Sequence, residues 1–275
     1  MISKQRMVFG LTLAMRLSMV TLLASAAPNP ADVLALEDQS RPEVLALKGD
    51  VFHVQGLDLD ERFIYVSSVD RMARRGLLHK FTRSGDLVAT LDLTDGPRYH
   101  TSGFALDGDV LWIATAEYRA GGSTRIAQID AATLRVLTSF TVADHIGAVA
   151  ACGGRIYGVN WDAQRIYAWD HAGRERAKAV NAARIAYQDL KCAGENLVAS
   201  GVVRGGTTGA VDWLDLATFE LKHSIAVARN APAPLWTAEG MALQGGRLFF
   251  LPEDGADGQA RVYAFDIAHV QDAAR

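Results

Sequence analysis

In five places, a His, Tyr or Thr precedes an acidic or basic residue by 17 positions. The pairs are His53 and Asp70, His100 and Glu117, His145 and Asp162, Tyr187 and Arg204, and Thr237 and Asp254. Imidazoles bind metals or move protons, carboxylates act as acids and bases, and guanidinium groups bind anions. The repeated spacing therefore predicts one site assembled from several equivalent positions of a repeating fold.

A strand-turn-strand pattern separates the two members of every pair, and successive pairs begin 47, 45, 42 and 50 residues apart. Runs of β-branched and aromatic residues broken by Gly and Asp turns are typical of strands. The first repeat predicts strands over Gly56–Leu59, Phe63–Val66, Leu77–Phe81 and Leu87–Leu93. Because such a unit must bury both faces on its neighbours, the repeat predicts an all-β fold, a β-propeller.

The last repeat has only three predicted strands, Gly240–Leu243, Leu248–Leu251 and Val262–Asp266. The missing strand is predicted at the other end of the sequence, where Glu43–Leu47 precedes His53 as an outer strand precedes each later repeat. We therefore expect a five-bladed β-propeller over residues 43–268, its ring closed by this N-terminal strand, which removes an exposed sheet edge. Residues 27–42 are expected to form a lead segment and residues 269–275 a tail.

Residues 1–26 have the features of a secretory signal peptide. Lys4 and Arg6 give a positive start, an apolar stretch follows, and Ala24–Ala26 is a small-residue cleavage site. No cysteine follows that site to carry a lipid. We expect a periplasmic or secreted protein without a stable membrane anchor after cleavage.

The 28 basic and 31 acidic residues nearly balance, so nothing favours non-specific binding to phosphate backbones. We expect a monomer with a small-molecule ligand and no nucleic-acid partner. Cys152 and Cys192 are the two cysteines of the chain. Export would permit a disulfide between them, but their equal parity within the repeat places both on the same sheet face, so two buried thiols are the alternative.

Two kinds of connection in a propeller emerge at the same end: those that enter the inner strand and those that join the second and third strands. Here these connections contain most of the unusual polar and aromatic residues, whereas the opposite end has plain turns. Loops at one end of a rigid repeat commonly carry function. The candidate ligand-binding residues are Gln55, Asp70, Tyr99, Glu117, Arg119, Asn160, Trp161, Asp162, Tyr187, Arg204, Glu253 and Asp254.

Two chemistries remain open for this end. His53, His100 and His145 occupy equivalent repeat positions and could bind a divalent metal such as Zn²⁺ with a free water position, while Asp189 and Glu239 could instead make an oxygen-rich Ca²⁺ site. Alternatively, Asp189 and Glu239 could act as a catalytic acid and base with raised pKa values. Arg119 and Arg204 would then receive a carboxylate or phosphate.

The order of short motifs from Val54–Gly56 through Asp144–Gly147 and Tyr187–Asp189 to Leu251–Gly255 resembles a family of bacterial and fungal propellers whose function is unknown. A fainter resemblance, in Val54–Leu57 and Arg155–Trp161, is to plant-type glutaminyl cyclases. Those five-bladed enzymes use a Glu-Gly pair in the second blade, where this chain has Ser102 and Gly103. The Glu-Gly pair of this chain is Glu239 and Gly240, in the fifth repeat.

The sequence therefore predicts an exported propeller that binds a small polar ligand in a central pocket. Metal-assisted or carboxylate acid–base hydrolase or lyase activity is the leading interpretation. A non-catalytic protein-interaction or ligand-sensing propeller is the alternative, and a glutaminyl-cyclase-like acyltransferase is a further one.

Overall fold

The computed structural model describes residues 42–227, 235–253 and 259–267. The described residues form strands and two short 3₁₀ helices, η2 (Trp161–Ala163) and η3 (Trp236–Ala238). Within them, no helix has the length and apolar character needed to span a bilayer. The expected signal peptide, most of the lead segment and the expected tail fall outside these ranges.

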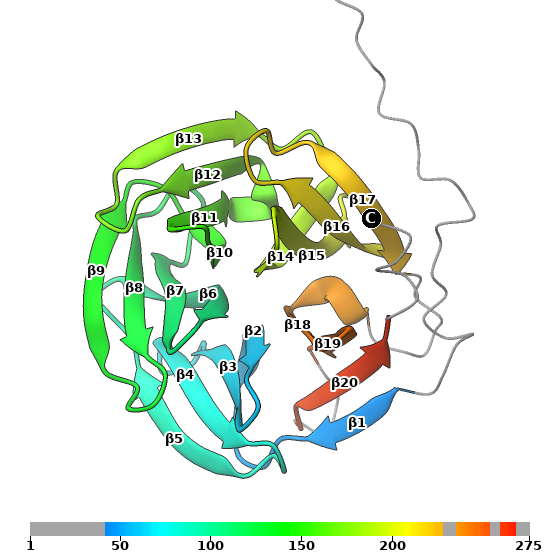
Figure 1. Cartoon of the computed structure of the whole chain (residues 1–275). Helices are drawn as coiled ribbons and strands as arrows, with labels where there is room; N and C mark the ends of the chain where they lie inside the picture. The colour runs from blue at the N-terminus through cyan, green and yellow to red at the C-terminus, as the bar shows by residue number, and fades with distance from the viewer. Residues whose placement is uncertain (1–41, 228–234, 254–258, 268–275) are drawn as a thin grey trace, which may run out of the picture.

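The strands form antiparallel groups of four, ordered from the centre of the molecule outward (Figure 1). The first two groups are β2 (His53–Leu59), β3 (Phe63–Asp70), β4 (Arg75–Thr82) and β5 (Leu87–Asp92), then β6 (Arg98–Asp107), β7 (Val110–Glu117), β8 (Thr124–Asp130) and β9 (Val136–Val142). The next two are β10 (Ile146–Cys152), β11 (Arg155–Asn160), β12 (Arg165–Trp169) and β13 (Glu175–Val180), then β14 (Ile185–Ala193), β15 (Asn196–Val203), β16 (Gly209–Asp215) and β17 (Leu221–Val227). The last sheet contains β18 (Gly240–Gln244), β19 (Arg247–Leu251), β20 (Arg261–Asp266) and β1 (Glu43–Ala46).

Two pairings connect distant parts of the sequence. Strand β1 pairs antiparallel with β20, Glu43 opposite Ala264, as the strand count predicted. A single parallel bridge between Ala148 and Gly103 joins the groups that start with β10 and β6. A Cβ atom on Gly103 would lie 2.5 Å from the Gln188 carbonyl oxygen, so the approach of the inner strands requires glycine there.

Burial explains why these residues form strands. The second strand of each group is buried on both faces, and strands such as β3 and β7 are nearly continuous apolar runs. Outer strands such as β5 and β13 alternate exposed and half-buried residues, as expected for strands with one face in water. Hydrophobic clusters fill the spaces between neighbouring groups, including the space between the last sheet and the first, where Phe249 and Leu57 belong to one cluster.

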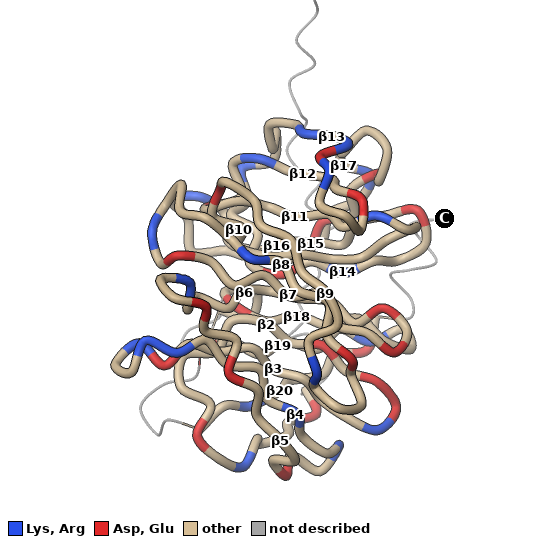
Figure 2. The backbone as a smooth tube through the Cα atoms, turned by 90° about the vertical axis from the view of Figure 1, so that its left-hand side faces the viewer, with Lys and Arg blue, Asp and Glu red and all other residues tan. Residues whose placement is uncertain are grey.

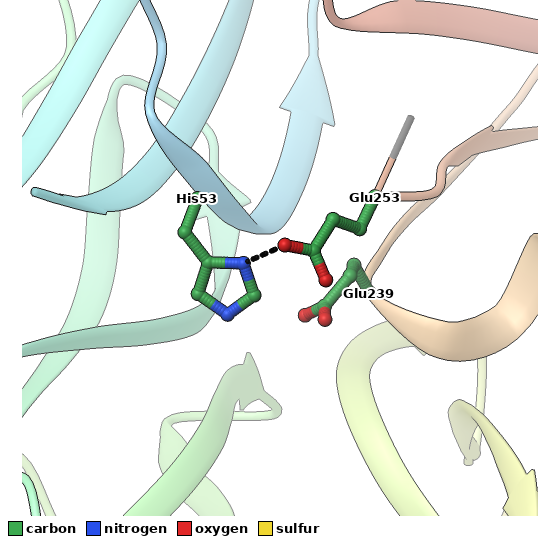
Figure 3. Close-up of side chains that lie close together, drawn as sticks. All are labelled: His53, Glu239 and Glu253. Carbon is green, nitrogen blue, oxygen red and sulfur yellow. Dashed lines mark hydrogen bonds and ion pairs between the residues drawn. The ribbon is translucent and has the colours of Figure 1, made fainter. Parts of the chain in front are cut away.

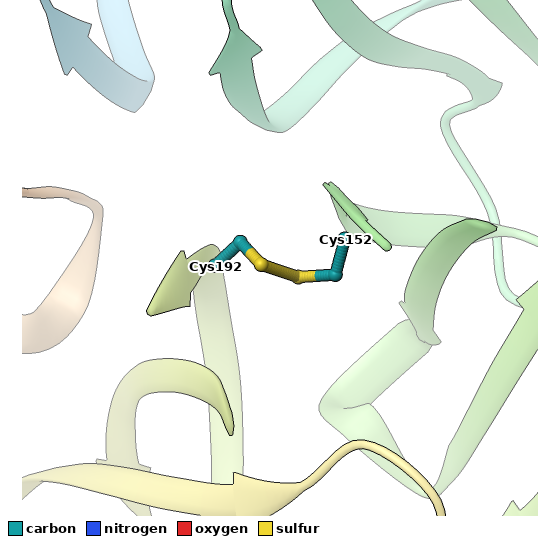
Figure 4. The surroundings of a disulfide bond; sticks show 2 residues. All are labelled: Cys152 and Cys192. Carbon is teal, nitrogen blue, oxygen red and sulfur yellow. A yellow bond between two sulfur atoms is a disulfide. The ribbon is translucent and has the colours of Figure 1, made fainter. Parts of the chain in front are cut away.

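A disulfide joins Cys152 at the end of β10 to Cys192 near the end of β14 (Figure 4). The sequence left open whether these cysteines form a disulfide or remain two buried thiols, and the structure shows the disulfide. Each strand carries a β-bulge, at Gly147 in β10 and at Gln188 in β14; Cys152 lies five residues beyond its bulge, and Cys192 lies four beyond its own. The two side chains therefore point to opposite faces of their sheets and meet between them, because a bulge resets the alternation of side chains.

Acidic and basic residues are interspersed over the loops and outer strands, while the inner strands carry few charges (Figure 2). This distribution agrees with the formal net charge of −3. The charged side chains inside the molecule are therefore exceptions that need specific partners.

Candidate functional site

Four inner strands carry a bulge where they enter the molecule at the same end. The extra residues are Gln55 in β2, Gly147 in β10 and Gln188 in β14, and β6 has two, Tyr99 and one more between Thr101 and Phe104. A bulge inserts one residue and redirects the side chains beside it. The local backbone thus turns polar side chains toward the centre at this end of the sheets.

These bulges surround a cavity of about 200 Å³. It is lined by residues from every group of strands: His53, Gln55, His100, Tyr118, His145, Gly147, Asn160, Trp161, Asp162, Tyr187, Gln188 and Glu239. Nine of these are among the candidate site residues from the sequence, so the structure brings these nine side chains to one cavity.

One side of the cavity holds a histidine beside two neighbouring glutamates (Figure 3). His53 Nδ1 lies 2.8 Å from Glu253 Oε1, and the Gln55 amide nitrogen lies 2.9 Å from His53 Nε2. Because that amide donates, Nε2 accepts and the ring proton is on Nδ1, directed at Glu253. The same amide nitrogen lies 3.1 Å from Glu239 Oε2, so Gln55 connects His53 to the second carboxyl group.

The two glutamates differ in their surroundings. Burial, together with the nearby charge of Glu253, raises the pKa of Glu239 well above its usual value. Burial also lowers the pKa of His53, although the Glu253 carboxylate opposes this change. The raised pKa of Glu239 favours its neutral carboxylic acid, and the lowered pKa of His53 favours a neutral imidazole that donates to Glu253.

Aromatic rings form the opposite wall. The His100 ring lies 4.5 Å from the Tyr118 ring and 4.9 Å from the His145 ring, and His145 meets Trp161 edge to face at 4.5 Å. His145 donates its Nδ1 proton to the Glu117 carbonyl oxygen at 2.7 Å. Burial lowers the pKa of both histidines, that of His100 strongly and with a further contribution from His145. Both rings are thus neutral and act as flat, weakly polar surfaces.

The three predicted metal ligands do not converge as a trio. Among the described residues, the group of His, Cys, Asp or Glu side chains that could hold an ion is His53, Glu239 and Glu253, with ligand atoms within 4.8 Å of one another. Zn²⁺ accepts one imidazole nitrogen and carboxylate oxygens at about 2.0–2.2 Å, so small side-chain rotations would close this group around it. The donor set fits zinc better than Ca²⁺, which takes about 6–8 oxygen ligands.

Several predicted ligand-binding residues lie beside the cavity and are already engaged. Glu117 accepts hydrogen bonds from Ser123 and from Arg119 at 2.9 Å, and Asp70 Oδ1 accepts the backbone N–H of Ala73. Arg204 donates to the carbonyl oxygens of Asp162 and Ala163. These contacts stabilise the loops that hold the cavity walls.

The remaining predicted residues are placed as follows. The Tyr99 ring lies tilted against the Tyr118 ring, with ring centres 5.8 Å apart. Tyr187 lines the cavity with its ring, while its hydroxyl group donates to Asp212 at 2.5 Å. Asn160 binds Asp144 at 3.1 Å. Asp254 lies outside the described residues.

Asp189 is fully buried and is not among the lining residues of the cavity. Its oxygens accept the Lys191 ammonium at 2.7 Å and the backbone N–H groups of Leu57, Leu190 and Met241. Burial raises its pKa to about 6, against the opposing effect of Lys191. These contacts tie β14 to β2 and β18; its catalytic role remains a prediction.

Three lining residues are not among the candidate site residues from the sequence: Tyr118, Gly147 and Gln188. Gly147 and Gln188 enter the cavity through bulges, which single sequences do not reveal. Tyr118 follows Glu117 directly, so the repeat itself marked its position. Arg71 lies outside the cavity lining and follows Asp70 directly, as Tyr118 follows Glu117. Its positive charge lowers the pKa values of His53, His100 and Glu239.

Residues 37–266 match a family described only as a family of unknown function, DUF6454. The chain belongs to the DUF6454 family. This confirms the predicted resemblance to a propeller family without a known function. No curated protein matches this DUF6454 sequence.

Solved structures show what this DUF6454 fold is similar to. A glutaminyl cyclase from Myxococcus xanthus superposes with a TM-score of 0.60 at 16% identity, covering 82% of this chain and 94% of that one. BamB from Moraxella catarrhalis gives 0.38 at 15% identity, over 76% and 59% of the two chains. The β-propeller domain of Cps50 (Swd1) from Myceliophteria thermophila gives 0.46 at 11%, over 77% and 66%. At these identities, the first likeness shows a propeller-like fold alone.

Proposed function

We propose that this DUF6454 protein is a five-bladed propeller closed by β1, and that it is a monomer exported to the periplasm or beyond. The four-strand groups support five blades if the single β6–β10 bridge is taken as a contact between blades. The pairing of β1 with β20 supports closure. The signal-like residues 1–26 and the disulfide suit an oxidising compartment.

The cavity binds a small polar ligand and converts it by carboxylate acid–base chemistry, as a hydrolase or lyase. The observation that carries this proposal is the contrast between the two glutamates beside one cavity. Glu253 accepts a hydrogen bond from a proton-bearing imidazole nitrogen, whereas among the described residues the hydrogen bond to Glu239 comes from the neutral Gln55 amide. Paired carboxyl groups in different surroundings divide naturally into an acid and a base.

In this mechanism each side chain has one role. Glu239 carries the transferable proton and gives it to the leaving group. Glu253, oriented by the Nδ1–H of His53, accepts a proton from water or from the carbon next to the bond that breaks. Gln55 holds Glu239 beside His53. Over one turnover Glu253 gains a proton and Glu239 loses one, so the number of protons on the two carboxyl groups is unchanged.

The test is a screen of the purified protein on esters, glycosides, amides and β-elimination substrates. Glu239→Gln and Glu253→Gln should each lower any turnover found by about 100-fold or more, since general acid–base catalysis contributes about 10²–10⁴. Glu195→Gln, in the exposed turn between β14 and β15, is the matched control and should keep full activity. Turnover that survives both site variants would refute the acid–base role.

Metal-assisted chemistry is the second candidate, because His53, Glu239 and Glu253 present three ligand atoms close together. A bound zinc ion would supply an activated water, and the three side chains would then be its ligands. Elemental mass spectrometry of the purified protein should find stoichiometric zinc that His53→Ala and Glu253→Ala remove. His171→Ala, in the exposed turn between β12 and β13, should retain it. If the purified wild type contains no metal, the metal-assisted candidate is wrong and the acid–base proposal remains.

Two further activities are separable by simple assays. The fold of the Myxococcus xanthus glutaminyl cyclase motivates incubation with a peptide that begins with glutamine. Release of ammonia, abolished by Glu239→Gln, would favour cyclisation. Recovery of a bound ligand in unchanged form, with no turnover in any screen, would favour a ligand-sensing or interaction role.

A further inference from the structure

Arg71 occupies the turn between β3 and β4, at the cavity end of the molecule, and is exposed. Within the described residues its guanidinium group forms no hydrogen bond or ion pair; its contact is the face of the Tyr118 ring, 6.0 Å from the ring centre. Tyr118 lines the cavity. The guanidinium group therefore lies beside the mouth of the cavity, with its donors unused.

The other two arginines that the sequence suggested for an anion are committed elsewhere. Arg119 forms an ion pair with Glu117 at 2.8 Å, and Arg204 donates to backbone carbonyl oxygens. A guanidinium group presents five donors in a planar fork that matches carboxylate and phosphate oxygens. Arg71, in contrast, leaves its fork open to a ligand beside Tyr118.

A second, independent feature lies deeper in the cavity. His100 is only 9% exposed, and its Nδ1 atom has no hydrogen-bond partner. A buried nitrogen without a partner costs roughly 1–3 kcal/mol unless something binds to it. Because His100 lines the cavity, a ligand that enters past Arg71 could supply that partner.

We propose that the ligand of this cavity carries an oxyanion, a carboxylate or a phosphate, bound by Arg71, on a flat apolar body that packs on Tyr118 and Trp161. The inference rests on the proposed binding pocket and adds the chemical class of its ligand. The edge-to-face arrangement of Tyr118 and Trp161, with ring centres 6.3 Å apart, provides the apolar surface. Glu253, the nearby carboxylate, already accepts a hydrogen bond from His53 and points its charge at that ring.

The test measures binding of three simple probes by isothermal titration calorimetry. Benzoate and phenyl phosphate carry an oxyanion on a flat ring, and benzyl alcohol is the neutral match. The wild type should bind at least one anionic probe about tenfold more tightly than benzyl alcohol, because charge-assisted hydrogen bonds are worth at least that factor. Preference for benzoate would identify an organic acid, and preference for phenyl phosphate a phosphorylated ligand.

Arg71→Met should weaken binding of the preferred anion about tenfold and leave benzyl alcohol unaffected. Arg62→Met is the matched control: Arg62 is also exposed and also lies over an aromatic ring, Phe63 at 5.3 Å, but at the opposite end of β3. It should change nothing. The oxyanion inference is wrong if anionic and neutral probes bind with equal affinity, or if Arg71→Met binds like the wild type. In either case the proposed binding pocket remains supported. No binding of any probe overturns both.

Discussion

Asp189 and Glu239 are both carboxyl groups inside the molecule, yet their surroundings differ. Asp189 accepts a lysine ammonium and three backbone N–H groups, whereas Glu239 accepts one side-chain amide and faces a second glutamate. The same contrast separates two histidines. His79 is hydrogen bonded through both nitrogens, to Ser68 and Thr90, while His100 has an unpartnered Nδ1. In these two comparisons the fully partnered group holds strands together, and the group with fewer partners lines the cavity.

Replacement of Asp189 should have the largest effect. Asp189→Ala leaves the Lys191 ammonium and three backbone N–H groups without their acceptor. Removing one partner of a buried ion pair costs about 3–5 kcal/mol, so the free energy of unfolding in urea should fall by that amount. Glu239→Gln should change it by less than about 1 kcal/mol. Similar losses in both variants would remove the distinction between the two carboxyl groups.

Loss of the disulfide should be nearly as costly. The bond between Cys152 and Cys192 closes a loop with a sequence separation of 40 residues, at the ends of β10 and β14 that lie away from the cavity. The chain-entropy relation gives about 4 kcal/mol for such a loop. Cys152→Ala with Cys192→Ala should lower the unfolding free energy by about 2–4 kcal/mol and leave probe binding intact. Weakened binding would show that the two ends of the molecule are coupled.

The pH dependence of stability should reflect His79. Burial lowers the pKa of His79 to about 4 from its ordinary 6.5. Between these values the unfolded chain binds the proton and the folded protein does not, so stability falls as the pH drops. The contribution is complete above about pH 6.5 and is lost as the pH approaches 4, a change on the order of 3 kcal/mol. In His79→Gln, the unfolding free energy from urea denaturation should change less with pH over this interval. If its pH dependence is unchanged, other groups cause that dependence.

His100→Phe should have the smallest effect on stability. Phenylalanine keeps the ring contact with Tyr118 and removes the unpartnered nitrogen. Replacing an unsatisfied polar group by an apolar one of similar shape is nearly neutral or stabilising, so the melting temperature should stay level or rise slightly. Binding of the preferred anionic probe should weaken, because its partner at Nδ1 is gone. A large drop in melting temperature would place His100 with His79 among the structural residues.

The fold could be predicted because its signal is local. The alternation of apolar and polar residues and the fixed spacing define each strand, and the confirmed pairing of β1 with β20 followed from a count of strands. The 17-residue spacing reflects the inner hairpin, in which His53 lies opposite Val69, the neighbour of Asp70. Such features need only short stretches of sequence.

Contacts between groups of strands could not be predicted in the same way. Glu253 and His53 are 200 residues apart, and their hydrogen bond depends on how two sheets meet at the centre. The bulges at Gln55, Gly147 and Gln188 shift side chains from one face to the other without a sequence signature. They decided both the disulfide and the lining of the cavity.

The pairing of β1 with β20 also has a consequence for how the chain reaches this structure. Val44 and Tyr263 are partners in one sheet, so that sheet cannot be completed until nearly the whole described chain has been synthesised. Contacts between segments so distant in sequence form slowly, because a long loop must close before they bring any stabilisation. Until then the buried apolar faces of β18 and β19 lack their outer neighbours. A chain released before Arg261–Asp266 would therefore be prone to association through those strands.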